Sequence, residues 1–340
     1  ARAAGDFNFN GQATGIGLAD FLTGQTSLVR HGAPGVLVMD QWYFGLYGQD
    51  TWRATDRITF NGGVRWEPFF GASSKNGATS NFVLDNFRKG IKTTRFINAP
   101  AGLIYPGDPG FPDGNSGLNT QWRNLSPRVG VAWDVNGDGR TAVRSSYGLN
   151  YDFPSSVFLY IAASASPFAN RVELSGVPFE DPYRFVGGDT HPLSATPPVD
   201  AQFPPFGAYG VMDPDINSTR VQSWNVTIER QIGAAWQASA SYLGSYADRM
   251  WGQVHINPGN FMGLGPCTIQ GVSYPSCTVT ANVDRRRTLY LENPTQGQWL
   301  GPVVEYADVG VQAYRGLKLS FRRRSDDGVS LSGNYTLSHC

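Results

Sequence analysis

The sequence predicts an all-β protein, an antiparallel transmembrane β-barrel, and three observations support this prediction. Segments in which apolar and polar residues alternate come in pairs, and a short polar turn joins the two members of each pair. Long stretches rich in Gly, Pro, Asn and Ser separate successive pairs. Charged residues make up only 16% of the chain, whereas aromatics reach 13% and Gly numbers 41, which suits a β protein with a large apolar surface. The 27 basic and 27 acidic residues cancel, so no nucleic-acid partner is expected.

The first pair of alternating segments covers about residues 40–70. Its second arm divides by parity into an apolar set and a polar set: Ile58, Phe60, Val64 and Trp66 against Thr59, Asn61, Arg65 and Glu67. A period of two marks a strand with one apolar and one polar face. Asp56 is the turn former in "RATDR". Before this pair we expect another strand in "DFNFNGQATG", then a short helical or loop segment in "IGLADFLTGQTSLVRHG" on the outer side.

The second pair, at about 125–153, surrounds the letters "NGDG", which allow two interpretations. Asp134 opens a D-x-N-x-D-G pattern typical of a calcium loop. Such a loop closes with a bidentate Glu at its last position, where this sequence has Ser145. Asn-Gly and Asp-Gly are also strong hairpin turns, and "NGDG" stands where the other pairs have their turns. We therefore favour the hairpin, with calcium as the lesser alternative.

The third and fourth pairs, at about 218–250 and 311–339, turn at "GAA" and "DDG". Their segments alternate as the earlier ones do, and each reaches the length of about 9 to 11 residues that a tilted strand needs to cross a bilayer. Tryptophans lie toward the strand ends, where the aromatic girdles of membrane proteins are found. They are Trp42, Trp52, Trp66, Trp133, Trp224 and Trp236.

The connections between pairs, at about 71–124, 154–217 and 251–310, are too long for ordinary loops of a compact soluble domain. Outer-membrane barrels, however, combine short periplasmic turns with long extracellular loops. No apolar run is long enough for a transmembrane helix, and only a closed barrel lets strands satisfy every backbone group in lipid. The sequence therefore predicts a barrel wall in the outer membrane, in contact with its lipid.

In such a barrel the polar residues of each alternating strand face the lumen, and the long loops contact the ligand. The residues expected to face the lumen are Arg65, Glu67, Arg144, Asn225, Glu229, Lys318 and Arg322. The loop aromatics expected to contact the ligand are Tyr105, Phe168, Phe206 and Tyr209, although loop aromatics also pack onto one another.

Two cysteines, Cys267 and Cys277, bracket a loop rich in Pro, Gly and Tyr. A disulfide between them requires an oxidising compartment. Two free thiols are the second possibility, and zinc is the third, although zinc sites usually have cysteines closer together and further ligands nearby. The third cysteine, Cys340, has no evident partner.

No catalytic or metal-binding pattern is found, so we predict neither an enzyme nor a cofactor or metal. The histidines are scattered, at His31, His191, His255 and His339. "GQATGIGLAD" lacks the strand and helix that frame a phosphate loop, and no nucleophile elbow occurs.

"RRR" at 285–287 suits a solvated turn better than a phosphate or glycan contact. "FRRRS" at 321–325 sits at the turn end of a strand, where arginine can reach interfacial phosphates; a structural use is favoured.

Two segments resemble a known family. "FGLYGQDTWRATDRITFNGGVRWEPF" is similar to a barrel hairpin of TonB-dependent outer-membrane transporters, with an aromatic-Gln-Asp-x-Trp-Arg strand followed by Asn-x-Gly-x-Arg-Trp-Glu. "NLSPRVGVAWDVNGDGRTAVRSSYGLNYD" is similar to the next hairpin. Together with "ADFLTG" upstream and "YRGLKLSFRRR…GVSLSGNYTLSHC" downstream, they resemble the Oar-like branch, in which a carboxypeptidase-regulatory-like domain precedes plug and barrel.

The resemblance implies a plugged barrel of about 22 strands that imports a scarce ligand with energy passed on by TonB. Its partners would be the plug domain, TonB and a small or oligomeric ligand. No TonB box or plug is seen in residues 1–340, so we expect a part of a longer barrel. Two alternatives remain: an outer-membrane adhesin or secretion factor without transport, and a soluble secreted β protein that binds carbohydrate.

Overall fold

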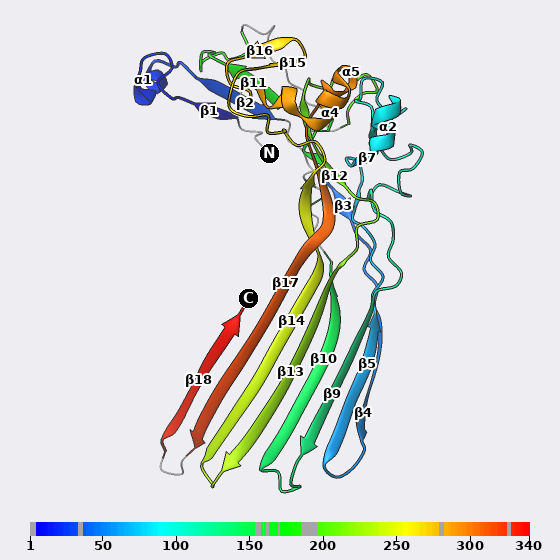
Figure 1. The fold of residues 1–340 in the computed structure, drawn as a ribbon, viewed down its shortest axis with the longest axis vertical. Coiled ribbons are helices and arrows are strands. Elements are labelled where there is room, and N and C mark those ends of the chain that lie inside the picture. The colour runs from blue at the N-terminus through cyan, green and yellow to red at the C-terminus, as the bar shows by residue number, and fades with distance from the viewer. Residues whose placement is uncertain are drawn as a thin grey trace.

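The computed structural model describes residues 5–32, 37–153, 158, 160, 163–168, 171–184, 196–278, 282–324 and 328–340. Figure 1 shows two parts, a long sheet of slanted strands and a layer of short strands, helices and loops beyond one end of it. We call the second part the loop layer; it consists of the described residues before Leu46 and in the three long connections, 67–124, 153–218 and 256–299. None of the helices in the described ranges has the length and apolar character needed to cross a membrane.

The long sheet is antiparallel between neighbours in the order β18-β17-β14-β13-β10-β9-β5-β4. Its strands are β4 (Leu46–Arg53), β5 (Ile58–Trp66), β9 (Leu125–Asp134), β10 (Thr141–Asp152), β13 (Thr219–Ile232), β14 (Trp236–His255), β17 (Leu300–Arg324) and β18 (Ser330–His339). Each of the four pairs of alternating segments forms an antiparallel strand pair, and the three described turns, after β4, β9 and β13, gather at the same end (Figure 1). Within the described residues, β4 and β18 are the free edges of this sheet.

The letters "NGDG" form the turn between β9 and β10. The Asp134 carboxylate accepts hydrogen bonds from the backbone N–H groups of Gly137 and Gly139, both at 2.9 Å. These two glycines have φ of +78° and +71°, in the left-handed region that glycine adopts without strain. The turn itself therefore uses the carboxylate that would have opened a calcium loop.

Strand register divides the long sheet into an apolar and a polar face. Residues paired across antiparallel strands point to the same side, and one continuous row is apolar throughout. It runs through Ile58, Trp133, Val143, Ile228, Ala240, Leu319 and Tyr335. The adjacent row points to the other side and contains Thr59, Ala132, Arg144, Thr227, Ser241, Lys318 and Thr336.

The apolar face has no protein layer over it in the described chain. Trp52 is 63% exposed, Val129 56% and Leu331 51%. A soluble protein rarely leaves so large a contiguous apolar surface in water. Contact with lipid would remove this surface from water, as the sequence predicts.

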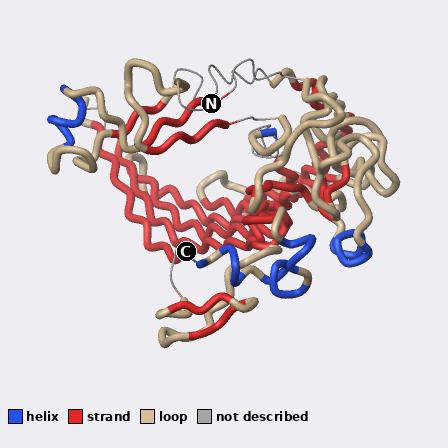
Figure 2. The backbone as a smooth tube through the Cα atoms, turned by 90° about the horizontal axis from the view of Figure 1, so that it is seen from above, coloured by secondary structure: helices blue, strands red, loops and turns tan. Residues whose placement is uncertain are grey.

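The loop layer contains regular structure that the sequence pattern does not reveal. A small sheet is formed by β1 (Asp6–Asn8), β2 (Leu28–Gly32) and β11 (Arg171–Ser175), next to α1 (Gly17–Leu22). Two-residue pairs join β3 (Met39–Asp40) to β6 (Ser73–Ser74) and β7 (Asn81–Phe82) to β8 (Leu103–Ile104). The remaining elements are α2 (Leu84–Lys89), β12 (Gly207–Met212), β15 (Cys267–Ile269), β16 (Val272–Tyr274), the 3-10 helix η2 (Asp284–Arg286), α4 (Thr288–Glu292) and α5 (Pro294–Gly297). Figure 2 shows this layer from above.

Two strands of the long sheet continue into the loop layer. β14 extends to His255 and β17 begins at Leu300, so the expected strand boundaries near 250 and 311 were wrong. Pairing between them survives a register shift between Ala247 and Gly252. The extended part of β17 also pairs in parallel with β12, the one parallel pairing in the otherwise antiparallel sheet of the described chain. The loop layer is therefore joined to the barrel wall by continuous strands.

The buried core of the described chain lies mainly in the loop layer. Its larger cluster takes side chains from all three long connections, among them Phe96, Tyr105, Phe168, Phe203, Tyr209 and Leu289. Buried amides join its segments: Asn81 donates to the carbonyls of Gly117 (2.9 Å) and Met212 (2.6 Å). Asn257 likewise donates to the carbonyls of Leu300 and Gly301 and accepts from the Leu289 N–H. These buried backbone groups are thus satisfied by hydrogen bonds to side chains from distant segments of the chain.

Candidate functional site

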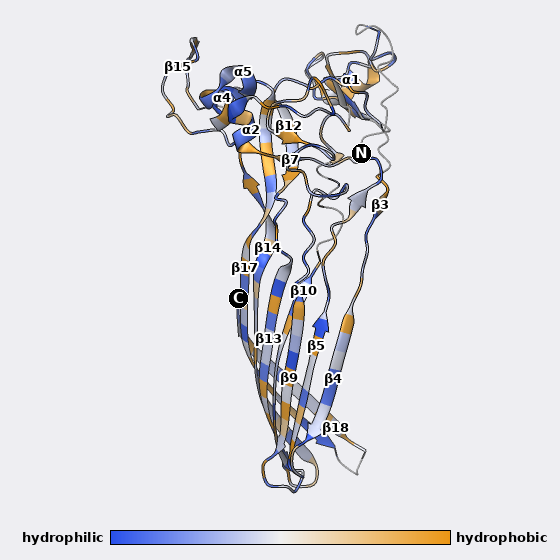
Figure 3. Ribbon diagram, turned by 90° about the vertical axis from the view of Figure 1, so that its right-hand side faces the viewer, coloured by the Kyte–Doolittle hydropathy of each residue, from blue (hydrophilic) through white to orange (hydrophobic). Residues whose placement is uncertain are grey.

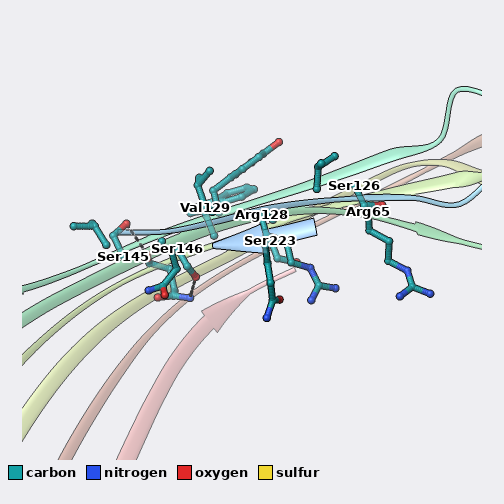
Figure 4. A pocket seen from close by; sticks show the side chains of 18 of the residues that line it. Arg65, Ser126, Arg128, Val129, Ser145, Ser146 and Ser223 are labelled. Atoms are coloured by element: carbon teal, nitrogen blue, oxygen red, sulfur yellow. Dashed lines mark hydrogen bonds between the residues drawn. The ribbon is translucent and has the colours of Figure 1, made fainter. Parts of the chain in front are cut away.

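The polar face of the long sheet is the first candidate site. Register places the strand residues expected to face the lumen on the same side of the sheet. These are Arg65, Arg144, Asn225, Glu229, Lys318 and Arg322, and Glu67 follows directly after β5. A hollow of about 1170 Å³ is lined by residues of β4, β5, β9, β10, β13, β14 and β17. In Figure 4, Arg65 and Arg128 extend to one side of the sheet and Val129 to the other.

Two ion pairs hold charges on this face. The Arg65 Nε lies 2.7 Å from the Glu67 Oε1, and the Arg65 Nη2 donates to the Tyr43 hydroxyl at 2.8 Å. Farther toward the turns, the Arg144 Nη1 lies 3.0 Å from the Glu229 Oε2, and the Gln237 side chain donates to the same carboxylate. The carboxylates of Glu67 and Glu229 are thus each neutralised by a nearby arginine.

Other polar groups on this face bond across strands or remain without an ionic partner. The Asn225 amide donates to the Ser146 hydroxyl at 2.6 Å, and Arg128 donates to Asn150 at 2.8 Å. Lys318 and Arg322 form no ion pair with any described residue. Positive charge therefore exceeds negative charge on the polar face toward the turns. Arg128 was visible in the sequence from its parity opposite Val129, but it was not among the lumen residues singled out.

The loop aromatics lie deeper than a ligand-facing position would place them. Tyr105, Phe168 and Tyr209 are 1%, 7% and 2% exposed, and all three belong to the core of the loop layer. Phe206 is half-buried and packs at 5.5 Å from the ring of Tyr290, with the Arg285 guanidinium over it. Contact of these four with a ligand stays a prediction, and the packing explains their burial without one.

Two of these aromatics carry hydroxyls that have no hydrogen-bond partner among the described residues. The hydroxyls of Tyr105 and Tyr209 are buried, and burial raises the pKa of both phenols. An unpaired buried hydroxyl costs about 1–3 kcal/mol of desolvation.

We therefore expect Tyr105→Phe and Tyr209→Phe to leave the stability of the loop layer unchanged or to raise it by up to about 1 kcal/mol. Hydrogen exchange of the loop-layer amides measures this. Tyr105→Ala is the matched comparison, because it removes the ring as well as the hydroxyl. Faster exchange in the Phe variants would mean that each hydroxyl has a hydrogen-bond partner within the protein.

The cysteine pair lies at the far edge of the loop layer. Cys267 and Cys277 are joined by a disulfide with Cα atoms 5.2 Å apart, which closes the short β15–β16 hairpin. The free-thiol and zinc alternatives are therefore wrong for this structure. Cys340 is free and exposed.

The arginine run at 285–287 contacts neighbouring residues of the loop layer. Arg287 pairs with Asp284 at 2.7 Å and donates to the Asn257 carbonyl, and buried Arg286 donates to the Asn282 amide oxygen. The "RRR" run therefore serves loop packing and not a solvated turn. Among the described residues no three His, Cys, Asp or Glu side chains converge as metal ligands would. His191 lies outside the described residues.

A family model described as "Outer membrane beta barrel domain" matches residues 1–340. No curated protein matches the chain. Solved structures that resemble it include the FrpB iron transporter (F3-3 variant) from Neisseria meningitidis, at 12% identity and a TM-score of 0.39, with 92% of this chain and 26% of that chain covered.

Two further structures show the same extent of likeness. The siderophore receptor PirA from Pseudomonas aeruginosa has 11% identity and a TM-score of 0.37, over 92% of this chain and 39% of that one. The outer membrane transporter YddB from Escherichia coli has 11% identity and a TM-score of 0.39, over 92% and 34%. The chain thus spans well under half the length of each. Because the family model matches its whole length, the chain belongs to the outer membrane beta barrel domain family, which places it in the outer membrane and not among enzymes.

Proposed function

We propose that the chain forms part of the wall and the ligand-facing loops of a TonB-dependent transporter that takes up a scarce ligand across the outer membrane. The observation that carries this proposal is the combination of a hollowed polar face with a packed loop layer beyond the long-connection end of the same sheet. A simple structural barrel needs no folded layer at its mouth. A receptor does, because ligand selection requires side chains held in fixed positions.

The free edges of β4 and β18 support a barrel with further strands, for which we propose about 22 in total. Both edge strands present unpaired backbone groups, which lipid cannot satisfy. A plug domain in the enclosed lumen would meet the polar face, where Arg65–Glu67 and Arg144–Glu229 are already paired and Lys318 and Arg322 are not. The similarity of the β4–β5 and β9–β10 hairpins to those of TonB-dependent transporters, in the Oar-like branch, is a further support.

Membership of an outer-membrane family removes the soluble carbohydrate-binding alternative. The adhesin or secretion-factor alternative would use the same loop layer without transport. Coupling to TonB distinguishes a transporter from an adhesin or secretion factor.

The test uses the full-length native protein, purified in detergent and passed over the immobilised periplasmic domain of TonB from the same organism. We expect specific retention that soluble TonB domain competes away, while a porin-type barrel of similar size passes through. A full-length protein that resides in the outer membrane but is not retained would contradict the transporter proposal and favour the adhesin.

A further inference from the structure

The apolar face of the long sheet contains a trough whose floor lies on β14. The apolar-face positions of this strand are, in order, Trp236, Ala238, Ala240 and Tyr242. The two alanines lie on the floor of a hollow of about 610 Å³, whose lining extends across the sheet from Ile228 and Arg230 of β13 to Gly333 and Tyr335 of β18. The trough therefore runs across four neighbouring strands.

Neighbouring strands supply the walls of this trough. Ile228 of β13 pairs with Ala240, and Leu319 and Phe321 of β17 pair with Ala240 and Ala238 on the other side. Ile228 is 53% exposed and Leu319 45%, so both walls rise above the floor. The ring of Phe321 lies over Gly333 of β18, where a Cβ would come within 2.6 Å of it. The glycine thus gives the ring room to lie against β18.

Two arginines stand at the turn end of the trough, on the same apolar face. Arg230 pairs in register with Ala238, and Arg323 pairs with Trp236, whose ring centroid lies 5.8 Å from the Arg323 guanidinium carbon. Neither arginine forms an ion pair with any described residue; Arg230 makes a long hydrogen bond of 3.4 Å to the Thr141 hydroxyl. Cations on a lipid-facing surface need an anionic partner near the membrane interface.

We propose that this trough binds one anionic phospholipid, with an acyl chain lying over Ala238 and Ala240 and the phosphate held by Arg230 and Arg323. The short turns of such barrels lie on the periplasmic side, so the lipid belongs to the periplasmic leaflet, which meets this end of the strands. A guanidinium matches phosphate with two parallel hydrogen bonds, and tryptophan is favoured at headgroup depth. The proposal requires the outer-membrane location but not the transport function.

The test is native mass spectrometry of the full-length protein released from detergent after incubation with phosphatidylglycerol or phosphatidylethanolamine. We expect one phosphatidylglycerol to remain bound. Ala238→Leu with Ala240→Leu fills the trough and is expected to abolish this retention. Ala313→Leu, on the same face of β17 but outside the trough, is the matched control and is expected to retain the lipid.

A second pair of variants tests the headgroup. Arg230→Gln and Arg323→Gln are each expected to lower the preference for phosphatidylglycerol about fivefold, the effect of one basic residue at a membrane surface. Arg324→Gln, which points to the opposite face, is expected to leave the preference unchanged. Inorganic phosphate in excess should not displace the lipid. Retention that survives filling of the trough, or that falls equally in the Ala313→Leu and Arg324→Gln controls, would overturn the proposal.

Discussion

Replacing Leu317 by arginine is expected to cost about 2–4 kcal/mol of the free energy of folding into a bilayer, the range for arginine at the midplane of a barrel's lipid face. Leu317 lies on the apolar face near the middle of the long sheet and pairs with Tyr242 and Leu337. Its side chain is 42% exposed in the described chain, so no described protein layer covers it and lipid can reach it. Urea titration of the full-length protein in phospholipid vesicles measures the loss.

Leu243→Arg is the matched control for this substitution. Leu243 lies one position beyond Tyr242 on β14, so its side chain points to the polar face, and its register partners are Asn225 and Gly316. Leu243 and Leu317 lie at nearly the same depth in the membrane, and both are changed from leucine to arginine. An arginine at position 243, however, enters the hollow lined by polar groups. We expect a change below about 1 kcal/mol. Equal losses in the two variants would mean that the two faces do not meet different media.

The strands could be predicted because lipid and an aqueous interior place opposite demands on successive residues. Ile58 and Phe60 must be apolar and Thr59 polar for the same sheet to serve both sides, and this leaves a period of two in the sequence. Figure 3 shows this alternation of orange and blue along the strands. The ends of β14 and β17 could not be predicted. Near Ala247 and Met250 the register shifts, and Arg249 adopts a φ of +56°, so the alternation stops although the pairing continues.

The loop layer could not be predicted because its partners are distant in sequence and follow no period. Asn81 owes its position to the carbonyl of Met212, and β12 is a strand only because β17 extends far enough to pair with it. Likewise Tyr105 and Tyr209 read as surface aromatics in Gly- and Pro-rich segments, whereas packing among three long connections buries them. The polar face was predictable residue by residue from parity. The loop aromatics were identified by type alone, and type does not determine exposure.

Phe96→Ala is expected to destabilise the loop layer by about 3–5 kcal/mol, the usual cost of deleting a buried phenyl ring. Phe96 is 2% exposed and its ring centroid lies 5.0 Å from that of Tyr105, 5.8 Å from that of Phe168 and 6.3 Å from that of Phe203. The Arg95 guanidinium also lies over the ring at 5.2 Å. Removal therefore leaves a cavity where two of the long connections, 71–124 and 154–217, meet, and both of them lose contacts.

The barrel wall should survive this substitution, since its strands are held by hydrogen bonds to neighbours and by lipid, and none of them runs through the cavity. We expect hydrogen exchange to accelerate in the loop-layer amides of Phe96→Ala while the strands from β4 to β13 keep their protection. Phe261→Ala is the control, because its ring is 73% exposed on the same layer and its loss leaves no cavity. If both variants loosened the layer equally, its order would not depend on the aromatic core. If Phe96→Ala also unfolded the strands, the two parts would form one cooperative unit, and ligand-driven change in the loops would pass directly to the wall.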